Sequence, residues 1–221
     1  MTFPFPHHVV GLGVPKGTVE YLGLFSSAVS GTTQTISNVD LAIPDPSRVI
    51  AIVWHAEGGS ANNRNWSRLD GADNEAGRWG VWGSHTGGIH FYTRPSGLTG
   101  SFAANFAATK SRMIAAVYAL YGFDVAGVDT SSSVLSTNSV TSRSTTITHP
   151  ANSLVLVEGL TTPQRSITWD ADLTENDEAG FGNYTFTVAS SKEAAAGNVT
   201  ARISWSSSCT GILRGLVIPE L

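Results

Sequence analysis

Short apolar segments, separated by turns rich in glycine, asparagine and proline, recur along the whole of this 221-residue chain. The clearest is Arg48–His55, a β-branched run that follows the turn Asp45-Pro46-Ser47 and is typical of a buried strand. Met113–Leu120 fits a helix or a buried strand, and we expect a strand because the segment is short and Gly122 follows closely. About a dozen such segments at regular spacing predict an all-β fold, an antiparallel β-sandwich of jelly-roll-like type.

Near the C-terminus, Arg202–Ser206 and Gly211–Ile218 are predicted as two separate strands. The Ser/Thr-rich segment 125–146 is expected to form exposed loop and an edge strand. No linker divides the chain sharply, so we predict one β-sandwich domain over residues 18–221.

Residues 1–17 differ from the rest because they are rich in proline, which fixes φ and removes a backbone donor. They predict an extended arm that needs a partner surface to become ordered, and the alternative is a frayed terminus. The arm contains the candidate anchoring residues Phe3, Pro4, Phe5 and Pro6.

Charged residues make up only 14% of the chain, and the formal net charge is −4. Nucleic-acid binding needs a basic surface that neutralises phosphates, so we expect no such partner. A surface of Ser, Thr and Gly suits close packing in an oligomer, because charges are depleted at the cores of interfaces. The composition therefore favours a homo-oligomer.

The single cysteine, Cys209, excludes an intrachain disulfide and a four-thiolate zinc site, and we expect it to be a small core residue. The first residues do not form a convincing secretion signal. No segment reaches the roughly 18 apolar residues that a membrane helix needs, so we expect no membrane insertion.

The sequence contains no recognisable set of catalytic residues. There is no Gly-x-Ser-x-Gly elbow and no His-Glu-x-x-His pattern. The acidic segment 170–178 resembles an oxygen-rich calcium loop, but Glu175 stands where such a loop needs glycine, and a solvated acidic loop is the alternative. We therefore predict no catalytic residues, no metal site and no cofactor.

Aromatic residues gather in a span that is also rich in Gly, Asn and Asp. Sugars bind by stacking on aromatic rings while polar side chains bond their hydroxyls. Trp79 and Trp82 are three residues apart, so on one strand they would face opposite sides, and at least one would be exposed or at an interface. Core burial and subunit packing are the alternatives, and Trp54 is expected to be core. The predicted carbohydrate-binding residues are Trp79, Trp82, Arg78, Asp73, Asn74 and Tyr92.

A recurring pattern of strands and turns resembles a known module. Ser47-Arg48 precedes one apolar strand, and Ser111-Arg112 precedes a second; between them lie an aromatic strand, a Pro-x-Gly-x-x-Gly turn and a Phe-x-x-x-Phe segment. Residues 152–157 and Thr168-Trp169 fit the second half of the module. Over roughly residues 40–218 this resembles a β-sandwich module of structural proteins in tailed phages, prophages and gene-transfer-agent-like particles.

This resemblance implies a non-enzymatic virion component, a head spike, decoration or tail-fibre piece, assembled in the bacterial cytoplasm. Its expected partners are other virion proteins, further copies of itself (a trimer by default) and a host surface polysaccharide. The first alternative is a free-standing carbohydrate-binding module or lectin. A glycan hydrolase on a sandwich fold is the third hypothesis, and it requires two carboxylates across a cleft.

Overall fold

The computed structural model describes residues 13–59, 64–82, 85–94, 96–129, 133–170 and 172–221 of the chain. Within these residues the regular elements are fifteen strands and one short 3-10 helix, η1 (Val125–Gly127). All strand pairs are antiparallel. The predicted all-β, sandwich-like fold is therefore confirmed, while its jelly-roll-like detail stays a prediction.

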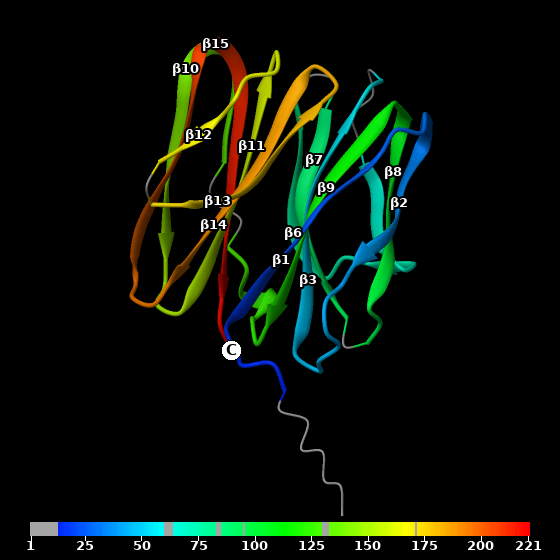
Figure 1. Cartoon of the computed structure of the whole chain (residues 1–221), viewed down its shortest axis with the longest axis vertical. Coiled ribbons are helices and arrows are strands. Elements are labelled where there is room, and N and C mark those ends of the chain that lie inside the picture. Colours follow the sequence, from blue (N-terminus) through cyan, green and yellow to red (C-terminus); the bar gives the residue numbers. More distant parts are fainter. Residues whose placement is uncertain (1–12, 60–63, 83–84, 95, 130–132, 171) are drawn as a thin grey trace, which may run out of the picture.

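Three sheets are stacked face to face as layers. Figure 1 shows the four-stranded sheet on the right, the central sheet in the middle and the six-stranded sheet on the left. The central sheet has the order β1-β9-β3-β7-β6. Its strands are β1 (Thr18–Ser27), β9 (Arg112–Tyr121), β3 (Arg48–Glu57), β7 (His85–Thr93) and β6 (Ala76–Trp82).

The four-stranded sheet, in the order β2-β8-β4-β5, covers one face of the central sheet. Trp54 lies fully buried between the two sheets and packs on Phe102 and Phe106, as expected for a core tryptophan. The strands are β2 (Gly31–Asp40), β8 (Thr99–Lys110), β4 (Arg64–Leu69) and β5 (Ala72–Asp73).

The six-stranded sheet covers the opposite face of the central sheet. Its main path is β10-β15-β11-β14-β13, and β12 pairs with β15. The long strand β15 pairs along its length with β10, and a third apolar cluster packs on the outer side of this sheet. The strands are β10 (Ser133–His149), β15 (Gly197–Pro219), β11 (Ser153–Thr162), β14 (Tyr184–Glu193), β13 (Thr174–Phe181) and β12 (Thr168–Trp169).

The central strands explain the unbroken apolar runs in the sequence. In β3 the side chains of Val49, Ala51 and Val53 face the six-stranded sheet, whereas Ile50 and Ile52 face the four-stranded sheet. Because both faces are covered, apolar residues need not alternate with polar ones. The strands predicted at 48–55 and 113–120 are confirmed, and the first apolar core joins residues from both halves of the chain. The prediction of one domain over 18–221 remains a prediction.

The register of the central sheet defines two ends of the molecule. Thr18, Tyr121 and Arg48 lie opposite one another at one end, where Gly17 donates to the Tyr121 carbonyl and Leu221 donates to the Gly122 carbonyl. We call this the terminal end, since the first described residues and the C-terminus meet there (Figure 1). At the opposite end, the far end, Glu57 pairs with Arg112 and His85.

Within the described residues, no helix is long and apolar enough to span a membrane. In the same part of the chain, no three or more His, Cys, Asp or Glu side chains gather in an arrangement that could hold a metal ion. Cys209 is buried and free, as expected of a small core residue.

Candidate functional site

The predicted sugar-binding tryptophans lie on an edge strand of the central sheet. Trp79 pairs with Gly88, and Trp82 pairs with His85 at the far end of the molecule. Strand β6 also contains Arg78, opposite Ile89. The side chains of these three predicted residues lie outside the described part of the structure, so only the course of their backbone is known.

Of the other predicted sugar-binding residues, Asp73 and Asn74 are accessible and Tyr92 is not. The Asp73 carboxylate is exposed and accepts a 2.9 Å bond from the Arg68 Nε. The Asn74 amide oxygen accepts from Arg64 at 3.2 Å. Tyr92 is 1% exposed, because its strand turns this side chain into the core beneath the four-stranded sheet. Its ring therefore offers no face to a sugar, and its burial raises the pKa of its hydroxyl.

Tyr92 belongs to a buried polar network that joins β3, β4 and β7. The Ser67 Oγ lies 2.7 Å from the His90 Nδ1, and the Tyr92 hydroxyl donates to the same Ser67 oxygen at 3.0 Å. The Trp54 Nε1 also donates to the His90 Nδ1, at 3.0 Å. Arg64 closes the network from the side with a 2.8 Å bond to the Ser67 Oγ.

A serine that bonds to a histidine is also the arrangement of a catalytic nucleophile and its base. Such a pair needs an accessible hydroxyl and a basic histidine nitrogen. Here Ser67 and His90 are at most 1% exposed, and the Trp54 indole occupies the same histidine nitrogen. Burial, with the nearby Arg64 and Arg214, holds the pKa of His90 well below its usual value. The arrangement therefore suits a neutral histidine that accepts bonds and ties three strands together.

A partly exposed aromatic site that the sequence prediction left out lies on the outer face of the four-stranded sheet. The Arg68 guanidinium sits 4.8 Å from the centre of the half-buried Trp66 ring and also bonds to Asp73. Next to it, Asn65 donates to Asn105 at 2.6 Å. Trp66 belongs to the aromatic span seen in the sequence, but only the strand register shows that it faces outward.

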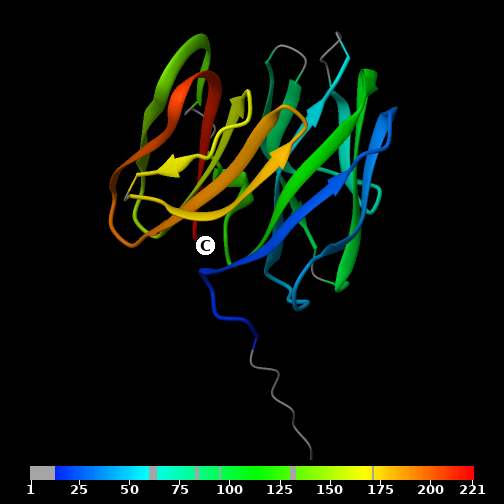
Figure 2. The ribbon, with the colours of Figure 1, turned by 45° about the horizontal axis from the view of Figure 1, so that its top comes forward.

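A second candidate site is the seam between β1 and β13, the neighbouring edge strands of the central and six-stranded sheets (blue and gold in Figure 2). The two strands are joined where the Tyr21 hydroxyl donates to Asp177 at 2.9 Å. Tyr118 donates in the same way to Asn176 at 2.9 Å. Burial, followed by the Asp177 contact, raises the pKa of Tyr21, so this phenol stays protonated and remains a donor.

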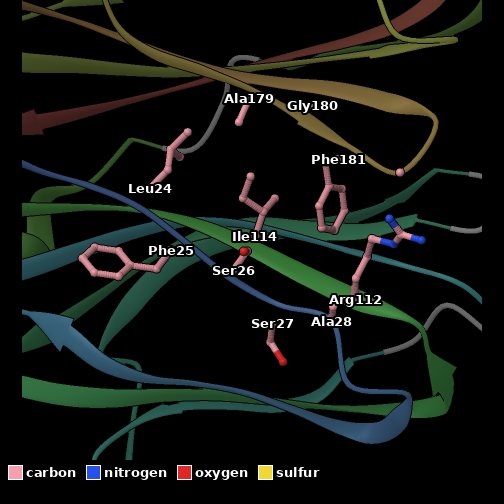
Figure 3. Close-up of a pocket in the computed structure, with 11 residues that line it drawn as sticks. Leu24, Phe25, Ser26, Ser27, Ala28, Arg112, Ile114, Ala179, Gly180 and Phe181 are labelled. Atoms are coloured by element: carbon pink, nitrogen blue, oxygen red, sulfur yellow. The ribbon is translucent and has the colours of Figure 1, made fainter.

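Cavities open along the seam on both sides of the Tyr21–Asp177 contact. Toward the far end lies a cavity of about 340 Å³ between β1, β9 and β13 (Figure 3). Toward the terminal end lies one of about 450 Å³, lined by Val19, Tyr118 and Lys192 among others. The seam is thus a groove that is divided where Tyr21 and Tyr118 bond to neighbouring residues of β13.

The acidic segment 170–178 was expected to be a solvated loop rather than a calcium loop, but from Thr174 onward it belongs to strand β13. Asp177 accepts from Tyr21, and the Glu178 carboxylate accepts the backbone N–H of Ile167 at 2.8 Å. Burial raises the pKa of Glu178. Asp170 lies apart, 3.8 Å from Arg202. The described acidic side chains therefore point to separate partners.

Comparison with protein-family models, with curated proteins and with solved structures found no match. The class of this protein is therefore given by its own structure: an all-β, sandwich-like protein of antiparallel sheets.

Proposed function

We propose that this chain is a non-enzymatic structural protein of a phage-like particle, a head spike, decoration or tail-fibre piece. In this proposal the terminal end attaches to neighbouring virion proteins and to further copies of the chain, with a trimer as the default. The far end is presented outward and contacts a host surface polysaccharide. The pattern of strands and turns that resembles the virion module motivates the choice of particle.

The observation that carries the proposal is the apolar character of the terminal end. Four large hydrophobic side chains are exposed among the described residues, and three of them are Ile43 at 65%, Leu98 at 63% and Leu221 at 70%. Hydrogen bonds bring their segments to the terminal end. The Leu41 N–H donates to the Leu98 carbonyl, the Tyr121 hydroxyl donates to the Ile43 carbonyl, and the Leu221 N–H donates to the Gly122 carbonyl. Exposed apolar residues gathered at one end are typical of a protein interface.

The arm predicted at residues 1–17 begins at this same end, since Gly17 bonds to Tyr121. We propose that the arm and the exposed apolar residues attach the protein together. Deletion of Met1–Lys16 should leave a folded β-sandwich that no longer assembles. Circular dichroism of the deleted protein reports folding, and its absence from purified particles reports the loss of assembly; particles that still incorporate it would contradict the role of the arm.

The direct test of the proposal is immunogold electron microscopy of particles from the source strain, with an antibody against this protein. Gold on heads or tails supports a virion component and locates it. Particles without gold, together with free protein in the medium, would reject the proposal.

A free-standing carbohydrate-binding module is the second candidate, and the outer face of the four-stranded sheet favours it. Trp66, Arg68 and Asp73 combine an aromatic ring, a guanidinium and a carboxylate on one accessible face. Glycan-array binding by isolated protein that is lost in Trp66→Ala, but kept in the matched variant Thr35→Ala on the same face, would support this candidate. Retention of binding in Trp66→Ala would reject this face as the site.

A further inference from the structure

Two sheet edges lie next to each other along the seam, and within the described residues neither is paired on its outer side. Strand β1 pairs only with β9, and β13 pairs only with β14. An edge strand presents a row of N–H and C=O groups that can accept an added strand. The seam therefore offers main-chain hydrogen bonds to an extended segment.

The far half of the seam also offers a hollow for a large apolar side chain. Figure 3 shows Leu24, Ile114 and Phe181 turned toward the space between β1 and β13, and Phe25 turned away from it. The rest of the lining is mainly small, with Ser26, Ser27, Ala28, Ala179, Gly180 and Gly182 around the cavity of about 340 Å³. An aromatic side chain entering from an added strand would find an apolar floor.

Among the described residues that line this cavity, the one charged side chain is already paired. The Arg112 guanidinium lines the cavity, and it lies 3.2 Å from the Glu57 carboxylate. The cavity therefore favours an uncharged apolar group over an acidic one.

The N-terminal segment has the sequence pattern of a strand that can pair on one side only. Proline occupies positions 4 and 6, and phenylalanine occupies positions 3 and 5. In an extended chain, alternate residues direct their N–H and C=O groups to the same side. Phe3 and Phe5 thus keep donors and acceptors for one neighbour, whereas Pro4 and Pro6 give the other side no donors, the arrangement of an outermost edge strand.

The described start of the chain leads away from its own seam. The Val14 N–H bonds to the Asp45 carboxylate at 3.2 Å, in the turn that connects the four-stranded sheet to β3. Phe5 reaches at most about 28 Å from Gly13. The cavity at Ser26 lies about 26 Å along β1 from Thr18 on the ordinary rise of a strand. The arm would have to reverse direction as well as cover this distance, so a neighbouring molecule is the better acceptor.

We propose that residues 2–8 of one copy add as an edge strand in the β1–β13 seam of a second copy, with Phe5 in the cavity at Ser26. This deepens the proposed function, on which it rests for the role of the arm. Because the arm and the seam are different surfaces, the contact is head-to-tail when each arm reaches the next copy in turn, and it closes into a ring if the rotation permits, as in the default trimer.

The test is cross-linking between two full-length variants, Phe5→Cys and Ser26→Cys, mixed in solution and oxidised. One variant has an affinity tag, so a mixed dimer is recognised by its mass on a non-reducing gel and by the linked peptides. Ser26 is exposed, so its substitution leaves the core unchanged, and the native Cys209 is buried, so it does not compete in the cross-linking. The matched control replaces Ser26→Cys with Thr35→Cys, an exposed position on the outer face of the four-stranded sheet.

A mixed cross-link at Ser26 but not at Thr35 is the expected result. A linked monomer in the double variant Phe5→Cys/Ser26→Cys, with no mixed cross-link, would overturn the proposal in favour of the chain's own arm. Absence of any cross-link at Ser26, or equal cross-linking at Thr35, would also overturn it. The experiment uses purified protein, so a positive result stands even if immunogold labelling finds the protein on no particle.

Sedimentation velocity gives a second measurement that needs no cysteine. The double variant Phe3→Asp/Phe5→Asp should associate at least about tenfold more weakly than the unmodified chain, since two charges cannot enter the apolar cavity. The control His8→Asp adds charge to the same arm outside the phenylalanine pair and should associate normally. Unchanged association of the double variant would overturn the proposal.

Discussion

The two faces of the central sheet are covered in different ways. Toward the four-stranded sheet, the core is sealed by Trp54 and a hydrogen-bonded network around Ser67 and His90. Toward the six-stranded sheet, the core contains the buried Arg214–Glu158 ion pair and opens sideways along the β1–β13 seam. One sheet thus supports a closed interface, where neutral groups and the Arg64 guanidinium share hydrogen bonds, and an open interface that contains a buried ion pair.

The difference shows how each half is held in register. In the sealed half, neutral hydrogen bonds connect three strands across the interface. In the open half, Arg214 bonds to Glu158 on its own sheet at 2.8 Å and to the Gly87 carbonyl of the central sheet at 2.9 Å. Because a buried charge is costly without its partners, the open half depends strongly on these two contacts of Arg214.

The largest expected effect comes from breaking that ion pair. Arg214→Met leaves the Glu158 carboxylate buried without its cation, which should lower the free energy of unfolding by ~3–5 kcal/mol at pH 7. Burial already raises the pKa of Glu158, and Arg214 opposes that shift. Without the arginine the pKa in the folded state rises further above the unfolded value, so the loss should shrink as the pH falls toward 5. Urea denaturation at both pH values measures this.

Two further variants make the comparison specific. Arg112→Met breaks a partly exposed pair with Glu57 and should cost no more than about 1 kcal/mol. Glu158→Leu/Arg214→Met removes both charges and should recover most of the stability lost in Arg214→Met. Equal losses in Arg214→Met and Arg112→Met would show that the buried pair is not the contact that holds the open half.

The sealed half should respond less strongly to the loss of one group. Ser67→Ala removes the oxygen that accepts from Tyr92 and Arg64 and leaves those donors without this partner. The expected loss of unfolding free energy is ~1–3 kcal/mol, measured by urea denaturation at pH 7. Ser26→Ala, at the exposed rim of the seam, is the matched control and should change little. Equal unfolding free energies of Ser67→Ala and Ser26→Ala would contradict a stabilising role of the Ser67 hydrogen bonds.

The sealed half should also respond to acid. The pKa of His90 is depressed in the folded state, so below its unfolded value of about 6.5 the unfolded chain binds a proton that the folded chain does not. Stability due to His90 is thus fully present above that pH and declines by about 1.4 kcal/mol for each pH unit below it. His90→Asn keeps an acceptor but does not titrate. Between pH 7 and pH 5.5 the urea midpoint should fall less in His90→Asn than in the unmodified chain. An equal fall in the two proteins would exclude His90 as the cause.

The sequence predicted the strands well where a segment's own residues decide the outcome. The apolar runs of β3 and β9 and the edge position of β10 are examples, since each follows from local pattern. The last strand was predicted as two pieces, but β15 is continuous from Gly197 to Pro219, and β10 pairs with it on both sides of Ser206–Ser208. That correction depends on long-range pairing, which no local pattern contains.

The site was harder to predict for the same reason. Tyr92 and Trp66 lie in one aromatic span, yet the structure buries the first and leaves the second half-exposed. Which of two alternate faces is covered depends on the sheet that packs there. The seam likewise results from two strands, β1 and β13, that are far apart in the sequence, so neither segment alone could indicate it.

The smallest expected effect tests whether the seam is open. Ser26→Leu places a larger apolar side chain at the rim of the cavity of about 340 Å³, where there is room for it, so the free energy of unfolding should change by no more than about 0.5 kcal/mol. Ala104→Leu is the matched control in the sealed half, where Ala104 is fully buried, and overpacking there should cost ~1–3 kcal/mol. Urea denaturation of both variants gives the two values. A loss for Ser26→Leu as large as that for Ala104→Leu would mean that the seam is as tightly packed as the sealed half, and the contrast between the two faces of the central sheet would disappear.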